Sequence, residues 1–476
     1  MSEEKTHELV IIGAGPGGYR AAFMASDLGL DVTMIDPEVN PGGICLYRGC
    51  IPTKTLLQLV KTKNEAEKSG DKGIKFSPPE IDIDKIREWK ESVVSRLTGG
   101  LGQLVSIRKI NYIKGYARFT GNNSLEIKKE NGDKEKIKFK NTIIATGVVP
   151  RQLPGIDNDI PGIMNSTAAL ELKDIPGELL VVGGGYIGIE VGTAYRSFGS
   201  EVTITELTGN IMPGMDEDLL AEYKKTGGKI FKNIFLETRV ESIKKKGKKL
   251  EVHFKSKEKG SFTGIFDKVL AAIGQEARTD HLGLENAGVK TGSEGFIQVD
   301  KTQQTNIKNI YAIGDIAGPP LLAHKASYEG MVAAEVIAGK NVVNDSRAIP
   351  MIVYTEPEIA TCGLSEKKAE EQGMQYRKVK FPWKASGRAM SMGEEHGFTK
   401  LLIDPETEAI LGAGIVGKNA GDLLPEIVLA IEMAATAKDL ALTIHPHPTL
   451  SETIMEAAEL YYGNPVHIYK KKRKLS

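Results

Sequence analysis

A glycine pattern that occurs twice constrains the fold of this chain more than any other feature. The first copy, Gly-Ala-Gly-Pro-Gly-Gly at 13–18, follows the apolar run Leu9–Ile12 and precedes a stretch with helical spacing of apolar residues. The run 31–36 is predicted to be the next strand and ends on Asp36, 23 residues after Gly13. Strand, glycine turn, helix and acid-terminated strand together form the unit that binds a dinucleotide.

Each glycine of this pattern has its own role. Gly13 makes the turn, Gly15 lets the backbone approach a pyrophosphate, and Gly18 lets the helix pack on the strand. The helix N-terminus then faces the phosphates, and Asp36 is placed to bind ribose hydroxyl groups. A purely structural glycine turn is the alternative, but the complete context favours dinucleotide binding.

The same unit recurs later in the chain. The apolar run 179–182 precedes Gly-Gly-Gly-Tyr-Ile-Gly at 183–188, and the run 201–206 ends on an acid, again 23 residues after the first glycine. A segment of alternating apolar and charged residues follows each copy, at 105–140 and at 238–270. The repeat indicates a duplicated nucleotide-binding domain, and therefore two bound dinucleotides.

The acid of the second copy indicates which nucleotide it binds. A carboxylate at Glu206 accepts hydrogen bonds from a free ribose 2′-hydroxyl and repels a 2′-phosphate, and no Arg follows in Glu-Leu-Thr-Gly. The second copy is therefore expected to bind NAD rather than NADP.

Two of the three cysteines, Cys45 and Cys50, lie between the two glycine patterns. Three cysteines are too few for a secreted disulfide scaffold, so this pair is expected to be catalytic or metal-binding. Residues five apart in a regular helix have Cα atoms about 8.6 Å apart, whereas a disulfide needs roughly 4.4–6.8 Å. A bond between them therefore requires a break in the helix, which Gly49 makes easier. Lys54 would then lower a thiol pKa.

Two other chemistries for these cysteines stay open. A structural zinc site needs four ligands, but only Cys362 remains and it is distant in the sequence. The pair could also be two inert, buried thiols.

Two further segments carry candidate site residues. The strand-like run 310–315 ends on Asp315, which could hold sugar or ribityl hydroxyl groups. His447 and Glu452 could form a proton-transfer pair. Thr449 and Glu452 fit equally well a capping box that opens a helix, and spacing does not distinguish these interpretations.

Charge and hydropathy exclude several classes of protein. Lys and Arg equal Asp and Glu at 62 each, so we expect no general attraction to nucleic acid or to an anionic membrane. No apolar run is long enough to span a bilayer, and the first residues resemble no signal or transit peptide. A cytoplasmic location is therefore expected. The basic run 470–474 is predicted to be a solvated tail, with a targeting or polyanion-binding patch as the alternative.

In their order along the chain, several segments resemble the flavoprotein disulfide reductases that bind two dinucleotides, the class I pyridine nucleotide-disulfide oxidoreductases. The resemblance covers nearly the whole length and is strongest to the dihydrolipoamide dehydrogenase branch. The segments that carry it are GAGPGG, GGICLYRGCIPTKTLL, ATG, GGGYIGIE, YAIGDIAGPPLLAHKA, YTEPEIA and HPHPTLSE.

This resemblance implies an α/β fold with two Rossmann-like dinucleotide-binding domains, each a three-layer parallel sheet with a β-meander insertion, and a C-terminal α+β dimerisation domain. The implied domains are an FAD-binding domain at 1–148, an NAD-binding domain at 149–277, a central segment completing the FAD domain at 278–347, and an interface domain at 348–476.

The resemblance also implies site residues. Cys45 and Cys50 would be the redox disulfide, Lys54 would pair with Glu190 near the nicotinamide, and His447, oriented by Glu452, would be the base acting on the disulfide of the other subunit of a homodimer. The implied FAD contacts are Gly13, Gly15, Gly18, Asp36, Lys54, Gly147 and Asp315, the implied NAD contacts are Gly183, Gly185, Gly188 and Glu206, and Gly274 and Ala323 complete the cofactor-binding set.

The implied reaction is oxidation of dihydrolipoamide, as a protein-bound dihydrolipoyl group, to lipoamide, with NAD⁺ reduced to NADH. The implied partner is a lipoyl-bearing acyltransferase or glycine-cleavage carrier protein of a multienzyme complex. The alternatives are an NAD(P)H-dependent reductase of another small disulfide and a non-catalytic flavoprotein subunit of a larger complex.

The chain departs from the family pattern at positions near the cysteines. Tyr47-Arg48 stands where such enzymes usually carry Asn-Val, and Asp36 replaces the more usual Glu. Arg48 is the departure that could change substrate choice. We expect it to favour an anionic substrate or to lower a cysteine pKa.

Overall fold

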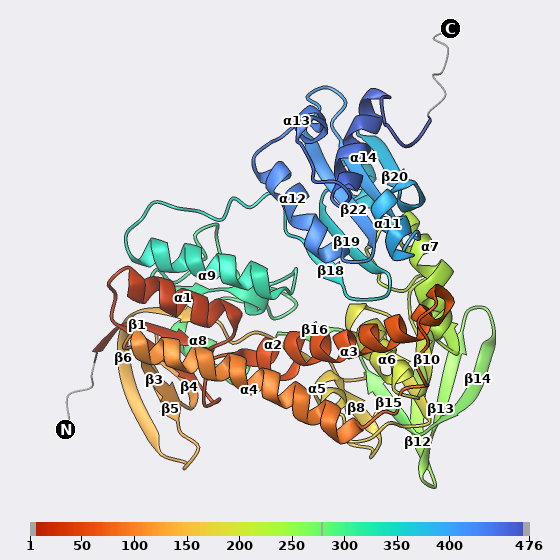
Figure 1. Cartoon of the computed structure of the whole chain (residues 1–476). Coiled ribbons are helices and arrows are strands. Elements are labelled where there is room, and N and C mark those ends of the chain that lie inside the picture. Colours follow the sequence, from red (N-terminus) through yellow and green to blue (C-terminus); the bar gives the residue numbers. More distant parts are fainter. Residues whose placement is uncertain (1–5, 278, 470–476) are drawn as a thin grey trace.

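The structure is a computed structural model that describes residues 6–277 and 279–469. The basic run 470–474 and the first five residues, to which two of the sequence predictions refer, lie outside the described residues. Most of the chain is built around three sheets, one in each nucleotide-binding unit and one in the C-terminal part. Figure 1 shows the C-terminal part in blue, above the two nucleotide-binding units.

The first sheet surrounds the first glycine pattern. Its strand order is β3-β2-β1-β6-β5-β4, with β17 paired to β6. β1 is parallel to both β2 and β6, and its residues Leu9, Val10 and Ile11 are fully buried, as expected for a central parallel strand. The strands are β1 (Thr6–Ile12), β2 (Val32–Asp36), β3 (Asn111–Lys114), β4 (Tyr116–Gly121), β5 (Ser124–Lys128), β6 (Lys134–Ile144) and β17 (Ile310–Ala312).

A distant segment completes this first unit. Ile310 of β17 pairs with Thr142 of β6, so the chain returns to the first sheet after the second nucleotide unit. Helices α1 (Pro16–Asp27) and α9 (Ala323–Ile337) lie side by side on one face of the sheet (Figure 1). Their backbones approach so closely that a Cβ on Gly330 would lie 2.5 Å from the carbonyl oxygen of Gly17.

The second sheet repeats the arrangement. Its order is β11-β10-β9-β15-β8, with all pairs parallel. Most of the alternating segment 238–270, up to Phe266, forms an antiparallel three-stranded sheet beside it, as the period of two predicts. The strands are β8 (Ile163–Asn165), β9 (Glu178–Val182), β10 (Glu201–Thr205), β11 (Asn233–Phe235), β12 (Thr238–Lys246), β13 (Lys249–Ser256), β14 (Gly260–Phe266) and β15 (Lys268–Ala271).

The C-terminal part is an antiparallel sheet covered by helices, in the order β18-β19-β22-β21-β20. With the two parallel units, it confirms the predicted fold class. In the part of the chain that the structure describes, no helix is both long and apolar enough to cross a membrane. The elements are β18 (Met351–Val353), β19 (Glu358–Gly363), β20 (Arg377–Pro382), β21 (Phe398–Ile403), β22 (Ile410–Gly417), α10 (Glu366–Gln372), α12 (Ala420–Glu432), α13 (Ala437–Leu442) and α14 (Glu452–Tyr462).

Candidate active site

The two cysteines lie on either side of a helix break. Cys45 belongs to α2 (Gly43–Arg48), and Cys50 is the first residue of α3 (Cys50–Lys68). Gly49 separates the helices with φ −142° and ψ −106°. The expected departure from a regular helix between the cysteines is therefore confirmed.

The thiols of Cys45 and Cys50 interact directly and differ in acidity. Both are free in this structure and form a hydrogen bond to each other. That bond, assisted by the Lys54 ammonium, lowers the pKa of Cys50, an exposed residue in this structure, to about 7. The same bond, together with burial, raises the pKa of Cys45. Cys50 is therefore the more acidic of the two thiols and ionises first.

This asymmetry predicts pH-dependent labelling. In the enzyme reduced by two electrons, the alkylation rate of Cys50 by iodoacetamide should rise with pH through a midpoint near 7, since only the thiolate reacts. Lys54→Met should move the midpoint upward by about one unit, because a neighbouring cation favours the thiolate. Rates at each cysteine can be measured by peptide mass spectrometry. Equal rates for both cysteines with a midpoint near 9 would contradict the assignment.

The Lys54 ammonium also has a buried acidic partner. Its Nζ lies 2.7 Å from Oε2 of Glu190, which is 2% exposed and belongs to α6 (Tyr186–Ser197) of the second unit. The other oxygen, Oε1, accepts a hydrogen bond of 2.9 Å from the backbone N–H of Tyr354. The expected pair of Lys54 and Glu190 is confirmed, and it joins α3 to α6.

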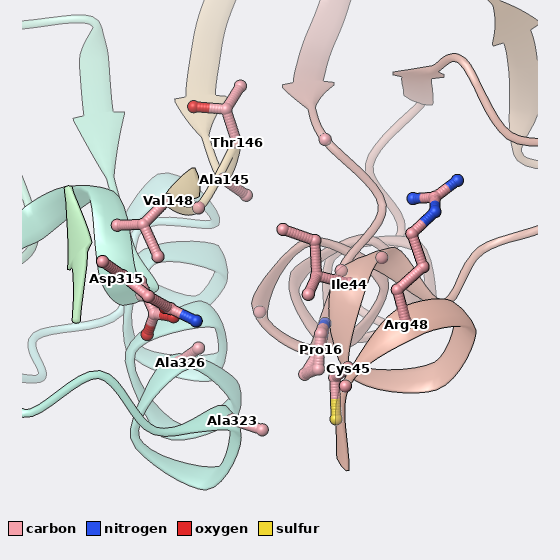
Figure 2. Close-up of a pocket in the computed structure, with 18 of the residues that line it drawn as sticks. Pro16, Ile44, Cys45, Arg48, Ala145, Thr146, Val148, Asp315, Ala323 and Ala326 are labelled. Carbon is pink, nitrogen blue, oxygen red and sulfur yellow. The ribbon is translucent and has the colours of Figure 1, made fainter. Parts of the chain in front are cut away.

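The two cysteines, Lys54 and Glu190 line a cavity of about 340 Å³, part of which Figure 2 shows. The cavity extends from the first glycine turn to the cysteines, and α6 forms part of its wall. The sequence-predicted residues that line it are Gly13, Gly15, Asp36, Cys45, Cys50, Lys54, Gly147, Glu190, Asp315 and Ala323. Gly18, which was also predicted to contact FAD, does not line it, and Gly183, Gly185, Gly188, Glu206 and Gly274 lie outside it.

The cavity lining fits a dinucleotide. A Cβ on Gly13 would lie 2.4 Å from the carbonyl oxygen of Ala145, so only glycine allows the chain to turn here. The N-terminus of α1 at Gly15 has no side-chain cap and is open to an anion. Oδ1 of Asp315 and the hydroxyl of Thr146 are buried and have no partner among the described residues. Ligand hydroxyl groups would satisfy such orphaned polar atoms.

The two strand-end acids are held in the same way. Asp36 accepts hydrogen bonds from the backbone N–H groups of Ala14 at 2.7 Å and Glu38 at 2.9 Å. The carboxylate of Glu206 accepts the matching bonds from Gly184 at 2.7 Å and Thr208 at 2.8 Å. Each acid is thereby fixed against its own glycine turn, as a ribose-binding carboxylate must be. The duplication predicted from the sequence extends to these contacts.

His447 and Glu452 form a second group of reactive side chains. Nδ1 of His447 lies 2.8 Å from Oε1 of Glu452, while Oε2 of Glu452 accepts a 2.8 Å bond from the backbone N–H of Thr449. The alternative prediction of a capping box is wrong, because only one of its two hydrogen bonds is present. The Thr449 hydroxyl donates to the carbonyl oxygen of Pro446, and α14 begins only at Glu452. Burial raises the pKa of Glu452, but these two hydrogen bonds outweigh it and hold that pKa low.

The imidazole of His447 is exposed, with 72% of the side chain accessible. Among the described residues of 348–469, none lines the cavity that contains Cys45 and Cys50. One chain therefore holds the cysteine pair and the His447–Glu452 pair at separate places.

Comparison with known proteins agrees with this geometry. Residues 7–330 match the pyridine nucleotide-disulphide oxidoreductase family, and residues 349–458 match the dimerisation domain of the same family. The chain belongs to this family. The resemblance inferred from the motifs is thus confirmed, and the dimerisation domain indicates a homodimer.

Individual relatives are similar to this chain over nearly its full length. The chain is 46% identical to the dihydrolipoyl dehydrogenase of Vibrio cholerae over 97% of each chain. It is 44% identical to that of Bacillus subtilis over 97% of this chain and 98% of the relative. The solved structure of LpdA from Mycobacterium tuberculosis has a TM-score of 0.89 at 26% identity, covering 96% of this chain and 99% of that one.

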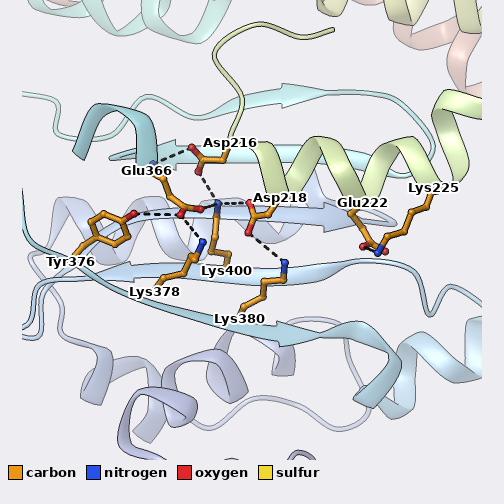
Figure 3. Close-up of polar contacts among 9 residues, drawn as sticks. All are labelled: Asp216, Asp218, Glu222, Lys225, Glu366, Tyr376, Lys378, Lys380 and Lys400. Carbon is orange, nitrogen blue, oxygen red and sulfur yellow. Dashed lines mark hydrogen bonds and ion pairs between the residues drawn. The ribbon is translucent and has the colours of Figure 1, made fainter. Parts of the chain in front are cut away.

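The sequence analysis missed a buried lysine in this family member. Lys400 of β21 is 1% exposed, and its Nζ lies 2.8 Å from Asp216, 2.7 Å from Asp218 and 2.7 Å from Glu366 (Figure 3). Asp216 and Asp218 lie at the start of α7 (Glu217–Thr226), and Glu366 opens α10. Burial lowers the pKa of Lys400, but the three carboxylates raise it above its usual value. The lysine therefore joins the C-terminal sheet to the second unit.

Proposed function

We propose that this enzyme is a dihydrolipoyl dehydrogenase. It oxidises a protein-bound dihydrolipoyl group to the cyclic disulfide and reduces NAD⁺ to NADH, with FAD in the first dinucleotide site and NAD⁺ at the second. The observation that carries the proposal is the Cys45–Cys50 pair in the wall of the dinucleotide cavity, beside the Lys54–Glu190 ion pair.

The chain's own groups perform the thiol chemistry. His447 of the partner subunit, fixed by its Glu452 contact, accepts a proton from one dihydrolipoyl thiol. The resulting thiolate attacks Sγ of Cys45 in the oxidised pair, forms a mixed disulfide and releases Cys50 as a thiolate. The second substrate thiol then displaces Cys45, which takes up that thiol's proton and leaves as a free thiol, and the lipoyl disulfide is complete.

Lys54 and the Cys45 thiol stabilise the negative charge left on Cys50. FAD, held by Gly13, Gly15, Asp36 and Asp315, would supply the two-electron chemistry that links the cysteines to NAD⁺. The overall reaction converts one dithiol and one NAD⁺ to one disulfide, one NADH and one proton. The separation of His447 from the cavity within one chain supports a site shared between the subunits of the homodimer.

We also propose the substrate carrier and the division of the chain. The dihydrolipoyl group would be supplied by an acyltransferase or by a glycine-cleavage carrier protein of a multienzyme complex, acting in the cytoplasm. The domains would be 1–148, 149–277, 278–347 and 348–476, in keeping with the pairing of β17 to β6.

Nucleotide selectivity tests the proposal. Oxidation of dihydrolipoamide should proceed with NAD⁺ at a kcat/KM about 100-fold or more above that with NADP⁺, because a 2′-phosphate beside the Glu206 carboxylate costs several kcal/mol. Glu206→Ser should reduce this ratio about tenfold.

Asp36→Ser is the matched control, because Asp36 makes the same backbone contacts in the first site. It should weaken flavin retention and leave the NAD⁺/NADP⁺ ratio unchanged. A wild-type enzyme that turns over no dihydrolipoamide with either nucleotide would refute the proposed substrate.

A further inference from the structure

Arg48 was first expected to act on the substrate or on the cysteines. Its guanidinium instead lies beside the acidic residues at the end of β2. It is the last residue of α2, and Figure 2 shows its side chain extending away from the Cys45 sulfur. The cation that acts on both thiols is Lys54. Arg48 lines the cavity together with Asp36 and Glu38, which end and follow β2.

The guanidinium of Arg48 is paired with carboxylates at this end. It forms an ion pair with Glu38, while 42% of its side chain remains accessible. Its charge also opposes the rise that burial causes in the pKa of Asp36, which reaches about 6. Arg48 therefore acts electrostatically on the acid that is placed to bind ribose.

The segment beneath this ion pair is held by two tyrosines. The Tyr47 hydroxyl donates to the carbonyl oxygen of Asn40 at 3.0 Å, and the Tyr112 hydroxyl donates to that of Glu38 at 3.1 Å. α2 is also fixed against the glycine turn, since a Cβ on Gly43 would lie 2.5 Å from Cα of Gly15. Arg48 therefore lies on a part of the wall that these contacts hold in place.

The charge balance at this end requires a cation. The pyrophosphate of a dinucleotide is a dianion and binds at the N-terminus of α1, beside Asp36. Asp36 and Glu38 would both repel it. A guanidinium is suited to this position because it can pair with a carboxylate and present its remaining N–H groups to phosphate oxygens.

We propose that Arg48 is a cofactor-retention residue, which neutralises Asp36 and Glu38 and binds the pyrophosphate-bearing half of FAD. It does not select the dithiol substrate. This inference rests on the proposed occupancy of the first site by FAD, and it replaces the expectation that Arg48 acts on the cysteines.

The test measures release of FAD from the full-length holoenzyme. Arg48→Val should increase the rate of FAD dissociation, followed by flavin fluorescence on dilution, about 10- to 100-fold. The increase should diminish at high salt, because screening weakens the wild-type contact. Arg48→Lys should restore part of the retention, and Glu38→Gln should retain FAD at least as well as wild type.

Arg108→Val is the matched control, because Arg108 pairs with Asp27 in the same unit but does not line the cavity. It should leave FAD release unchanged. With FAD saturating, the visible flavin spectrum and the preference for dihydrolipoamide over dihydrolipoate should be the same in Arg48→Val and wild type.

Unchanged FAD release in Arg48→Val would overturn the inference, as would a changed preference between the two substrates. Either result would leave the proposed function intact if wild type still oxidises dihydrolipoamide. Purification of wild type without flavin would instead refute the cofactor assignment itself.

Discussion

Replacing Cys45 or Cys50 by serine should reduce dihydrolipoamide turnover by about 10⁴-fold or more, while FAD remains bound. Each sulfur has a role that a hydroxyl does not fulfil: Cys45 accepts the substrate thiolate, and Cys50 is released as a thiolate beside Lys54. Turnover is measured as NADH formation, and flavin content from the visible spectrum. The single losses should not add in the double variant, because the two cysteines act as one unit.

Cys362→Ser provides the control for loss of a thiol. Cys362 is buried in β19, and burial raises its pKa to about 12, so it takes no part in thiol chemistry at neutral pH. This variant should keep wild-type turnover per folded enzyme. If Cys45→Ser or Cys50→Ser retained more than a few per cent of turnover, the cysteine pair would not be the route of the electrons.

Lys400→Met should destabilise the contact between β21 and α7 by about 3–5 kcal/mol. The substitution leaves the carboxylate of Asp216, which is 7% exposed, without a cation. Asp218 and Glu366 keep partial partners in Lys380 and Lys378, so Asp216 bears most of the cost. Hydrogen exchange at the backbone amide of Glu366, which donates to Asp216, reports this local opening.

The matched control is Lys378→Met, because Lys378 pairs with the same Glu366 but is 40% exposed. Its loss should cost less than about 1 kcal/mol. Lys400→Met combined with Asp216→Asn should recover part of the stability. Equal exchange in Lys400→Met and Lys378→Met would show that the buried cluster does not hold the two parts together.

The cost of Lys400→Met should depend on pH. Burial raises the pKa values of Asp218 and Glu366, but their ion pairs with lysines outweigh it and hold both pKa values low. A lowered carboxyl pKa contributes stability above the unfolded-state pKa of about 4 and loses it as the pH falls through the folded-state value. The difference between variant and wild type should therefore diminish in acid.

Much of the fold could be predicted because it depends on local patterns. The first and last glycines of the turns at 13–18 and 183–188 leave no room for a Cβ, and the acids at their strand ends recur at one spacing. The helix break between Cys45 and Cys50 followed from assuming that they pair, because residues five apart in a regular helix are too far apart for a disulfide. Such constraints act within a few residues, so the sequence displays them directly.

The contacts that the sequence did not reveal join distant segments. Lys400 meets Asp216 and Glu366 across two units, and no local period marks a buried lysine. Arg48 departs from the family pattern and was expected to favour an anionic substrate or to lower a cysteine pKa, but its long side chain pairs with Glu38. The sequence shows that the backbone of Arg48 lies near the cysteines. It does not show in which direction the guanidinium points.

Trapping of the cysteines with iodoacetamide, before and after anaerobic addition of one equivalent of NADH, tests the central claim most directly. The account predicts that Cys45 and Cys50 resist alkylation in the oxidised enzyme and that both become labelled after reduction. Reduction of the flavin without labelling of either cysteine would contradict it, because the electrons would then bypass the pair.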